Sequence, residues 1–142
     1  MAGWIAGRMG TVVAVLLLCG VMAGPVSAQP PAAVARGAAE AQADCRGAGG
    51  RPSLMQNFET QADLNGDGQP DYLHDLSRLD CAGAASFFCG SAGCPLIVYL
   101  SSPGGYRVQG LGHVQGWSLE QGGALPVLRL ATQGPPDEPG RP

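Results

Sequence analysis

The sequence predicts a mainly β protein, a small domain of antiparallel hairpin and meander strands stapled by disulfides. Residues 95–101, PLIVYLS, are rich in aromatic and β-branched side chains, and the turn sequence SSPGG follows them. Glycine-rich turn signals recur along the second half of the chain, which is typical of antiparallel strands. Four cysteines fall within the same short domain. Together these observations predict that the strands are held together by disulfides rather than by a large apolar core.

The individual strands are predicted from alternation and from turns. Residues 55–64 are expected to form a strand that enters a polar loop at Asp63, and residues 71–76 return as a strand or a short helical turn. Residues 106–112 alternate Tyr, Val and Gly with Arg and Gln, so 95–112 is predicted to be a hairpin. Two further strands, HVQGWSLE and LPVLRLA, are separated by Gln-Gly-Gly.

Residues 1–28 have the features of a cleaved secretory signal. Arg8 and the amino terminus supply positive charge, an apolar stretch follows, and small residues up to Ala28 suit a signal peptidase. The apolar stretch is shorter than the roughly 20 residues of a membrane span. The alternative is a lipoprotein acylated at Cys19, but Leu18 stands where a small residue is needed. We therefore expect a periplasmic or secreted protein with no membrane span in its mature form.

The rest of the chain divides into three parts. Residues 29–44 contain no large apolar side chain beyond valine, so we expect a flexible leader with weak helical tendency at most. Residues 133–142 are rich in proline and are expected to be a disordered tail. Between them, residues 45–132 form one small domain that includes a polar loop at 63–74. A domain of this size usually needs staples.

The cysteines are the predicted staples. An even number in a short exported chain indicates disulfides, and four cysteines allow three connectivities. We favour Cys89–Cys94, because the segment CGSAGC is short and has two glycines, and this leaves Cys45–Cys81 as the second pair. The spacing is not that of a zinc ribbon. Neither histidine lies in a recognisable motif with a nucleophilic cysteine.

Charge restricts the partners. After removal of the signal the chain has seven Arg, no Lys and eleven acidic residues, a net charge of −4. Such a chain repels nucleic acid and anionic lipid and attracts cations. There is also no basic stripe interleaved with aromatic residues, so nucleic-acid binding is not expected. Six of the acids lie in a segment whose one arginine is Arg78: Glu59, Asp63, Asp67, Asp71, Asp75 and Asp80.

The segment DLNGDGQPDY, residues 63–72, has oxygen-bearing side chains at every second position. Gly68 permits a sharp turn, and Gly66 removes a side chain that would crowd an ion. Three carboxylates this close together would repel one another without a cation. The pattern predicts a calcium site. Its ligands would be Asp63, Asn65, Asp67, the carbonyl of Gln69 and Asp71, with Asp75 as a further candidate.

The loop departs from an EF-hand, because Pro70 and His74 stand where an apolar residue and a bidentate glutamate are expected. The flanking segments also lack helical periodicity. The loop resembles instead the calcium hairpin of FG-GAP repeats, D-x-N-G-D-G-x-x-D followed by an apolar strand. That resemblance implies a β-hairpin loop that binds calcium through Asp63, Asn65, Asp67, Asp71 and the Gln69 backbone. A propeller is not expected, since the chain has a single copy.

A wider resemblance covers about residues 45–106. The order of Cys, DLNGDGQPDY, Cys, CGSAGCP and Tyr is similar to that of small exported bacterial proteins with one such loop and paired cysteines. That family has no assigned role, so the resemblance implies no activity.

Three functions are compatible with these patterns. The first, which we favour, is a non-enzymatic exported module in which calcium is chiefly structural. The second is an envelope interaction or inhibitor protein that binds an envelope protein partner through the disulfide loop 89–94. The third is a small metal-assisted hydrolase, which would need a base beside a metal-activated water, and His74 is the candidate for that base.

Overall fold

The structure, a computed structural model, describes residues 29–133. The predicted signal peptide and residues 134–142 of the predicted tail lie outside the described residues. Among residues 29–133 no helix is long and apolar enough to cross a membrane. The elements are α1 (Ala32–Gly47), β1 (Arg51–Leu54), β2 (Glu59–Ala62), β3 (Asp71–Asp75), the 3-10 turn η1 (Leu76–Arg78), β4 (Leu79–Ala82), β5 (Cys94–Ser102), β6 (Gly105–Val114), β7 (Gly116–Gln121) and β8 (Pro126–Ala131).

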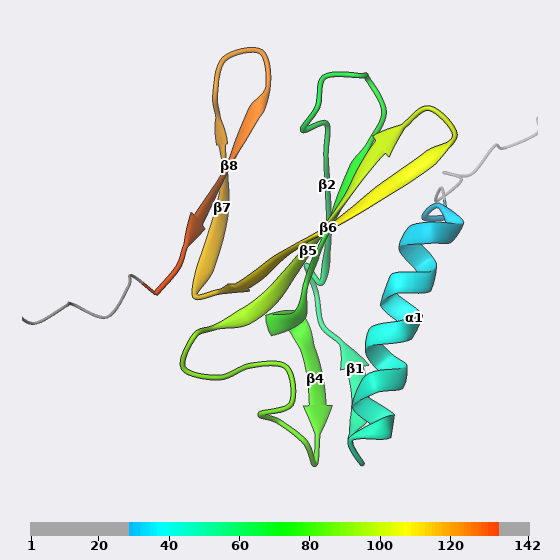
Figure 1. Cartoon of the computed structure of the whole chain (residues 1–142), viewed down its shortest axis with the longest axis vertical. Coiled ribbons are helices and arrows are strands. Elements are labelled where there is room, and N and C mark those ends of the chain that lie inside the picture. Colours follow the sequence, from blue (N-terminus) through cyan, green and yellow to red (C-terminus); the bar gives the residue numbers. More distant parts are fainter. Residues whose placement is uncertain (1–28, 134–142) are drawn as a thin grey trace, which may run out of the picture.

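The predicted mainly β class is confirmed, and the sheets are small and antiparallel. The largest has the order β2-β3-β5-β6, and two-stranded sheets β1-β4 and β7-β8 accompany it. β5 and β6 form the predicted hairpin, with Ser102 opposite Gly105. β7 and β8 are the two further predicted strands, except that His113 and Val114 belong to β6. In Figure 1 the β7-β8 hairpin stands on one side of the four-stranded sheet and α1 on the other.

β3 lies inside the sheet, and Asp71 to His74 are buried. On one face, Leu73 joins an apolar cluster against which Trp117 of β7 packs. On the other face, Tyr72 joins Val34 of α1 and Tyr99 of β5. The strand is thus covered by the β7-β8 side on one face and by the helix on the other, which is why its sequence is apolar at successive positions.

The helix α1 corrects the prediction of a flexible leader at residues 29–44. Val34 and Cys45 are fully buried. The segment lacks large apolar side chains, and its small residues instead allow close packing: a Cβ on Gly37 would lie 1.7 Å from the Tyr99 hydroxyl oxygen. The helix is therefore stabilised by tertiary contacts rather than by a wide apolar face of its own.

Both disulfides have the favoured connectivity, Cys45–Cys81 and Cys89–Cys94. The first spans 36 residues and ties the last turn of α1 to β4. By chain entropy it contributes about 4 kcal/mol, and the short second disulfide contributes about 2 kcal/mol. Two such bonds are compatible with an oxidising, extracellular compartment.

Candidate metal-binding loop

The polar loop joins β2 to β3 as a hairpin connection, with Ala62 opposite Asp71 at its base. Gly66 and Gly68 have φ angles of 79° and 77°. This left-handed backbone strongly favours glycine. The two glycines therefore allow the tight winding of the chain that the sequence pattern required.

Alternate side chains of the loop turn back onto its backbone. The two carboxylate oxygens of Asp63 accept hydrogen bonds from two glycine N–H groups, at 2.6 and 3.0 Å. Asn65 Oδ1 accepts from the N–H of Asp67 at 3.0 Å, and Asp67 Oδ1 accepts from the N–H of Gln69 at 2.8 Å. Each of these oxygens keeps a second lone pair. The backbone thus orients the side chains without using up their capacity to bind an ion.

Asp71 closes the loop and is fully buried. It accepts the N–H of Leu64 at 2.7 Å on Oδ2, and on Oδ1 the N–H and hydroxyl of Ser101 at 2.7 and 2.8 Å. The same hydroxyl oxygen lies 2.7 Å from Asp67 Oδ2. It also accepts a hydrogen bond from Asn65 Nδ2 at 3.1 Å. Because a hydroxyl has one proton, the carboxylates of Asp67 and Asp71 share a single donor there.

The carboxylates of the loop form no ion pair with a basic side chain among residues 29–133. The two ion pairs formed within residues 29–133 lie outside the loop. The Ser101 hydroxyl and the Gln69 N–H lower the pKa of Asp67 below its ordinary value of 3.8, so this carboxylate is ionised at neutral pH. Nearby, burial and then the charges of Asp71 and Asp67 raise the pKa of Tyr106 above 10.0. The loop is therefore a concentrated negative site.

A cavity of about 420 Å³ opens beside the loop, and its lining includes Asp67, Gln69, Ser101 and Tyr106. The last two residues were not anticipated from the sequence. Ser101 comes from β5 and Tyr106 from β6, and the Tyr106 hydroxyl donates to the Pro70 carbonyl at 3.0 Å. The one sequence signal for Ser101 is that it ends a predicted strand whose other residues are apolar.

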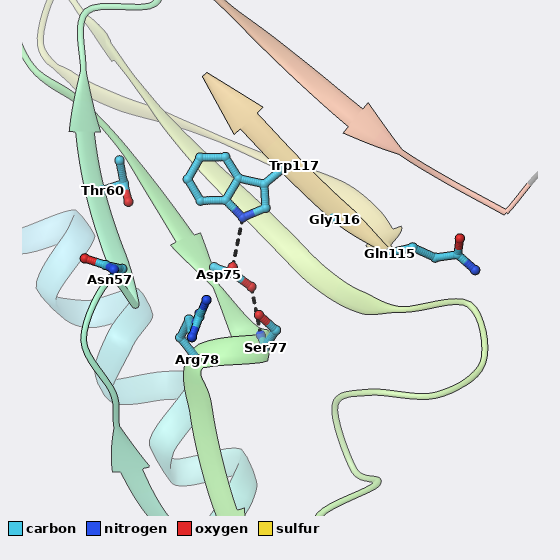
Figure 2. A pocket seen from close by; sticks show the side chains of 8 residues that line it. All are labelled: Asn57, Thr60, Asp75, Ser77, Arg78, Gln115, Gly116 and Trp117. Carbon is cyan, nitrogen blue, oxygen red and sulfur yellow. Dashed lines mark hydrogen bonds between the residues drawn. The ribbon is translucent and has the colours of Figure 1, made fainter. Parts of the chain in front are cut away.

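Asp75 and His74 do not join the loop. Asp75 lies at the other end of β3, where Trp117 Nε1 donates to it at 2.8 Å and the N–H of Ser77 donates at 2.9 Å (Figure 2). His74 is fully buried, with Nε2 3.2 Å from Glu59 Oε2. Burial lowers the pKa of His74, and the hydrogen bond and charge of Glu59 only partly oppose this. The candidate ligands are thus reduced to those of the loop itself.

Across residues 29–133, no three His, Cys, Asp or Glu side chains are grouped closely enough to hold a metal ion by themselves. The candidate set of the loop therefore cannot rest on its three carboxylates alone, and it adds to them the amide oxygen of Asn65 and the carbonyl of Gln69. Mixed oxygen sets of this type suit calcium. Comparison with known proteins finds no matching family, no similar curated protein and no similar solved structure. The resemblance to FG-GAP loops stays a prediction.

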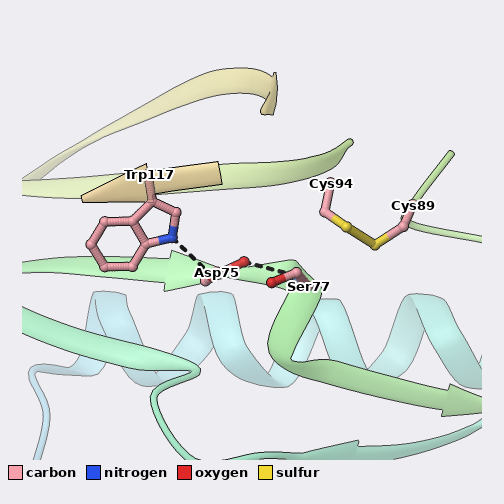
Figure 3. Close-up of a disulfide and its surroundings, with 5 residues drawn as sticks. All are labelled: Asp75, Ser77, Cys89, Cys94 and Trp117. Carbon is pink, nitrogen blue, oxygen red and sulfur yellow. Dashed lines mark hydrogen bonds between the residues drawn. A yellow bond between two sulfur atoms is a disulfide. The ribbon is translucent and has the colours of Figure 1, made fainter. Parts of the chain in front are cut away.

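The second disulfide closes a separate short loop, and Figure 3 shows this disulfide beyond the Asp75–Ser77 end of β3. Gly90 and Gly93 exchange two backbone hydrogen bonds across it, at 2.9 and 3.0 Å. Just before the loop, the side chain of Phe87 is 50% exposed and packs edge-on against Phe88. Aromatic side chains are enriched at protein interaction sites.

Proposed function

We propose that this protein is a non-enzymatic, exported module that binds calcium in the β2–β3 loop, and that the ion is chiefly structural. One observation carries the proposal: the carboxylates of Asp67 and Asp71 share the single proton of Ser101, with no basic side chain in the loop. Asp71 is fully buried, where an unbalanced charge is most costly. A divalent cation held between these groups would offset their repulsion.

The donor set favours calcium over other divalent ions. The candidate ligands Asp63, Asn65, Asp67, Asp71 and the Gln69 carbonyl offer oxygen only, whereas zinc prefers nitrogen and sulfur. Magnesium demands a nearly ideal octahedron, while calcium accepts more ligands in a flexible loop. Extracellular calcium modules have dissociation constants of about 10⁻⁴ to 10⁻³ M, and we expect this range or slightly tighter binding.

The position of His74 supports a non-enzymatic role. A metal-assisted hydrolase would need a base beside the ion, and His74 is buried against Glu59 instead of facing the loop. The location in the periplasm or outside the cell rests on the predicted signal at residues 1–28, and the two disulfides agree with it.

Thermal unfolding of the oxidised chain tests the calcium proposal. The midpoint is measured in EDTA and then in graded calcium, magnesium and zinc. When free calcium is a hundredfold above the dissociation constant, binding adds about 2.7 kcal/mol, a rise of roughly 10–20 °C for a domain of this size. Asp67→Ala should abolish the rise, because it removes an exposed ligand while leaving the core intact. Asp80→Ala, an exposed aspartate on β4, is the matched control. Equal midpoints in EDTA and calcium would refute the proposal.

A second candidate function is binding of an envelope protein through the loop 89–94, and the exposed ring of Phe87 favours it. A photo-crosslinking residue at Ser91, in the middle of this loop, should give one defined protein adduct in exporting cells. Phe87→Ser should remove that adduct without changing the melting temperature. Absence of an adduct at Ser91 would contradict this function and leave the calcium proposal untouched.

A further inference from the structure

A second cavity, of about 460 Å³, lies between the start of β7 and the β1–β2 segment of the chain (Figure 2). None of residues 63–71 lines it, so it is distinct from the calcium loop. Its lining is mostly polar with one aromatic ring, unlike the largely apolar linings of most small-molecule pockets, so it suits a polar ligand. These residues are Asn57, Thr60, Asp75, Ser77, Arg78 and Trp117.

Trp117 forms the aromatic wall, and its orientation is set before any ligand arrives. Its Nε1 donates to Asp75 Oδ2 at 2.8 Å, and the other Asp75 oxygen is held by the N–H of Ser77 at 2.9 Å. The ring also packs against the apolar cluster that contains Leu73, yet it remains partly exposed. A ring fixed in this way loses little freedom when a ligand packs on it.

The polar side of the cavity keeps groups for a ligand. Arg78 is exposed and takes part in neither ion pair formed within residues 29–133. Figure 2 shows it extending toward Asp75 beneath the Trp117 ring. Asn57 has a φ of 62° and is the one described residue other than glycine with a positive φ. Asn57 lies in the turn before β2, where asparagine tolerates this backbone conformation, and the turn presents its amide at the cavity.

The charges and hydrogen-bonding groups together select a class of ligand. Arg78 and Asp75 carry opposite charges and both line the cavity without forming an ion pair, so the lining has no net charge and favours neither a strong anion nor a cation. The guanidinium donates, whereas the Thr60 hydroxyl and the Asn57 amide both donate and accept, which suits hydroxyl groups. A purely apolar ligand would leave these groups without partners. The indole face offers a flat apolar surface for a ring.

We propose that this cavity binds one pyranose unit of a saccharide, with the C–H face of the sugar on Trp117 and its hydroxyls on Arg78, Asn57 and Thr60. The proposal goes beyond the calcium role and does not depend on it. A neutral sugar matches all three properties of the cavity at once: balanced charge, mixed donors and acceptors, and a single aromatic wall.

Tryptophan emission tests this directly. The chain has two tryptophans, Trp4 in the predicted signal and Trp117, so the exported protein without its signal reports on the cavity alone. It is titrated, in saturating calcium, with methyl β-glucoside, methyl β-galactoside and methyl N-acetyl-β-glucosaminide, while Trp117 fluorescence and its indole N–H resonance are followed. We expect a saturable change with at least one glycoside and a dissociation constant of about a millimolar, as for other small ligands in open sites. Arg78→Ala should weaken binding at least about tenfold, since it removes charged hydrogen bonds.

Two further variants serve as a control and as a second test. Arg107→Ala removes another exposed arginine, on β6, and should leave binding unchanged. Asn57→Gly keeps the left-handed backbone but removes the amide side chain, so it should weaken glycoside binding. It provides the second test if the Arg78→Ala variant does not fold. The proposal is overturned when none of the three glycosides gives a saturable change, or when Arg78→Ala and Asn57→Gly both bind as the parent does. A response to sodium sulfate in place of the glycosides would also overturn it, because it would identify an anion site.

Discussion

Asp71 and Asp75 occupy the two ends of one strand, β3, on the same face, and their surroundings differ. Asp71 is fully buried and binds the backbone and hydroxyl of Ser101. Asp75 is partly exposed and binds the indole N–H of Trp117 and the backbone at the start of η1. One aspartate therefore lies beside a second carboxylate that shares its donor, and the other lies beside an arginine.

The difference teaches that neighbouring strands, rather than residue type, decide what each carboxylate does. β5 brings Ser101 to one end of β3, and this gathers negative charge around a shared proton. β7 brings Trp117 to the other end, and Arg78 lines the same cavity there without forming an ion pair with Asp75. We therefore expect the first end to bind a cation and the second a neutral ligand, although both are built from the same acidic segment.

Replacing each aspartate by alanine should separate the two ends most clearly. Asp71→Ala leaves the N–H groups of Leu64 and Ser101 without their acceptor in a buried site. At about 1–3 kcal/mol for each lost partner, we expect a loss of roughly 3–4 kcal/mol in the free energy of unfolding. Urea unfolding measures it, and calcium should no longer stabilise the variant.

Asp75→Ala should cost less, about 1–2 kcal/mol, because it removes the cap of a short turn and one indole hydrogen bond at a partly exposed site. Its calcium response should match that of the parent chain. Asp80→Ala sets the baseline for an exposed aspartate. Equal losses at Asp71 and Asp75, or loss of the calcium response in both, would remove the distinction between the two ends.

Features that are encoded by adjacent residues could be predicted from the sequence, and features that depend on distant residues could not. The hairpin 95–112 and the Cys89–Cys94 pair are encoded by adjacent residues, and both were predicted. β1 was missed, because Arg51–Leu54 shows no alternation and is defined by its pairing with β4. α1 was missed because its burial depends on the close approach of Gly37 to Tyr99, which is distant in the chain.

The same reasoning applies to the sites. The spacing of residues 63–71 is local, so the loop and its two glycines could be predicted. The same spacing suggested Asp75 as a further ligand. It could not indicate that Trp117, 42 residues further along the chain, donates a hydrogen bond to that carboxylate. The role of Ser101 depends likewise on the pairing of β3 with β5. Properties that depend on strand neighbours need the structure.

His74 lies between the two aspartates in sequence but on the opposite face of β3, and it should make the stability of the domain depend on pH. Its ring is 4.7 Å from those of Phe58 and Tyr99, and its Nδ1 has no hydrogen-bond partner within the described residues. Burial lowers its pKa below the ordinary value of 6.5. Between those two pKa values the unfolded chain binds more protons than the folded chain, so stability rises with pH. The contribution is complete above about pH 6.5 and is lost as the pH falls toward the lowered pKa.

The test is urea unfolding in a pH series together with an NMR titration of the His74 ring. Glu59→Gln should extend the loss of stability to lower pH, because Glu59 is the group that raises the pKa of His74 against the effect of burial. His113→Asn, at the other histidine, is the control and should leave the profile unchanged. The three residues of β3 would then respond to different species: Asp71 to calcium, Asp75 to the ligand of the cavity, and His74 to protons. A His74 that titrates at or above 6.5 in the folded chain would contradict this, since burial would then no longer be the dominant influence on that face.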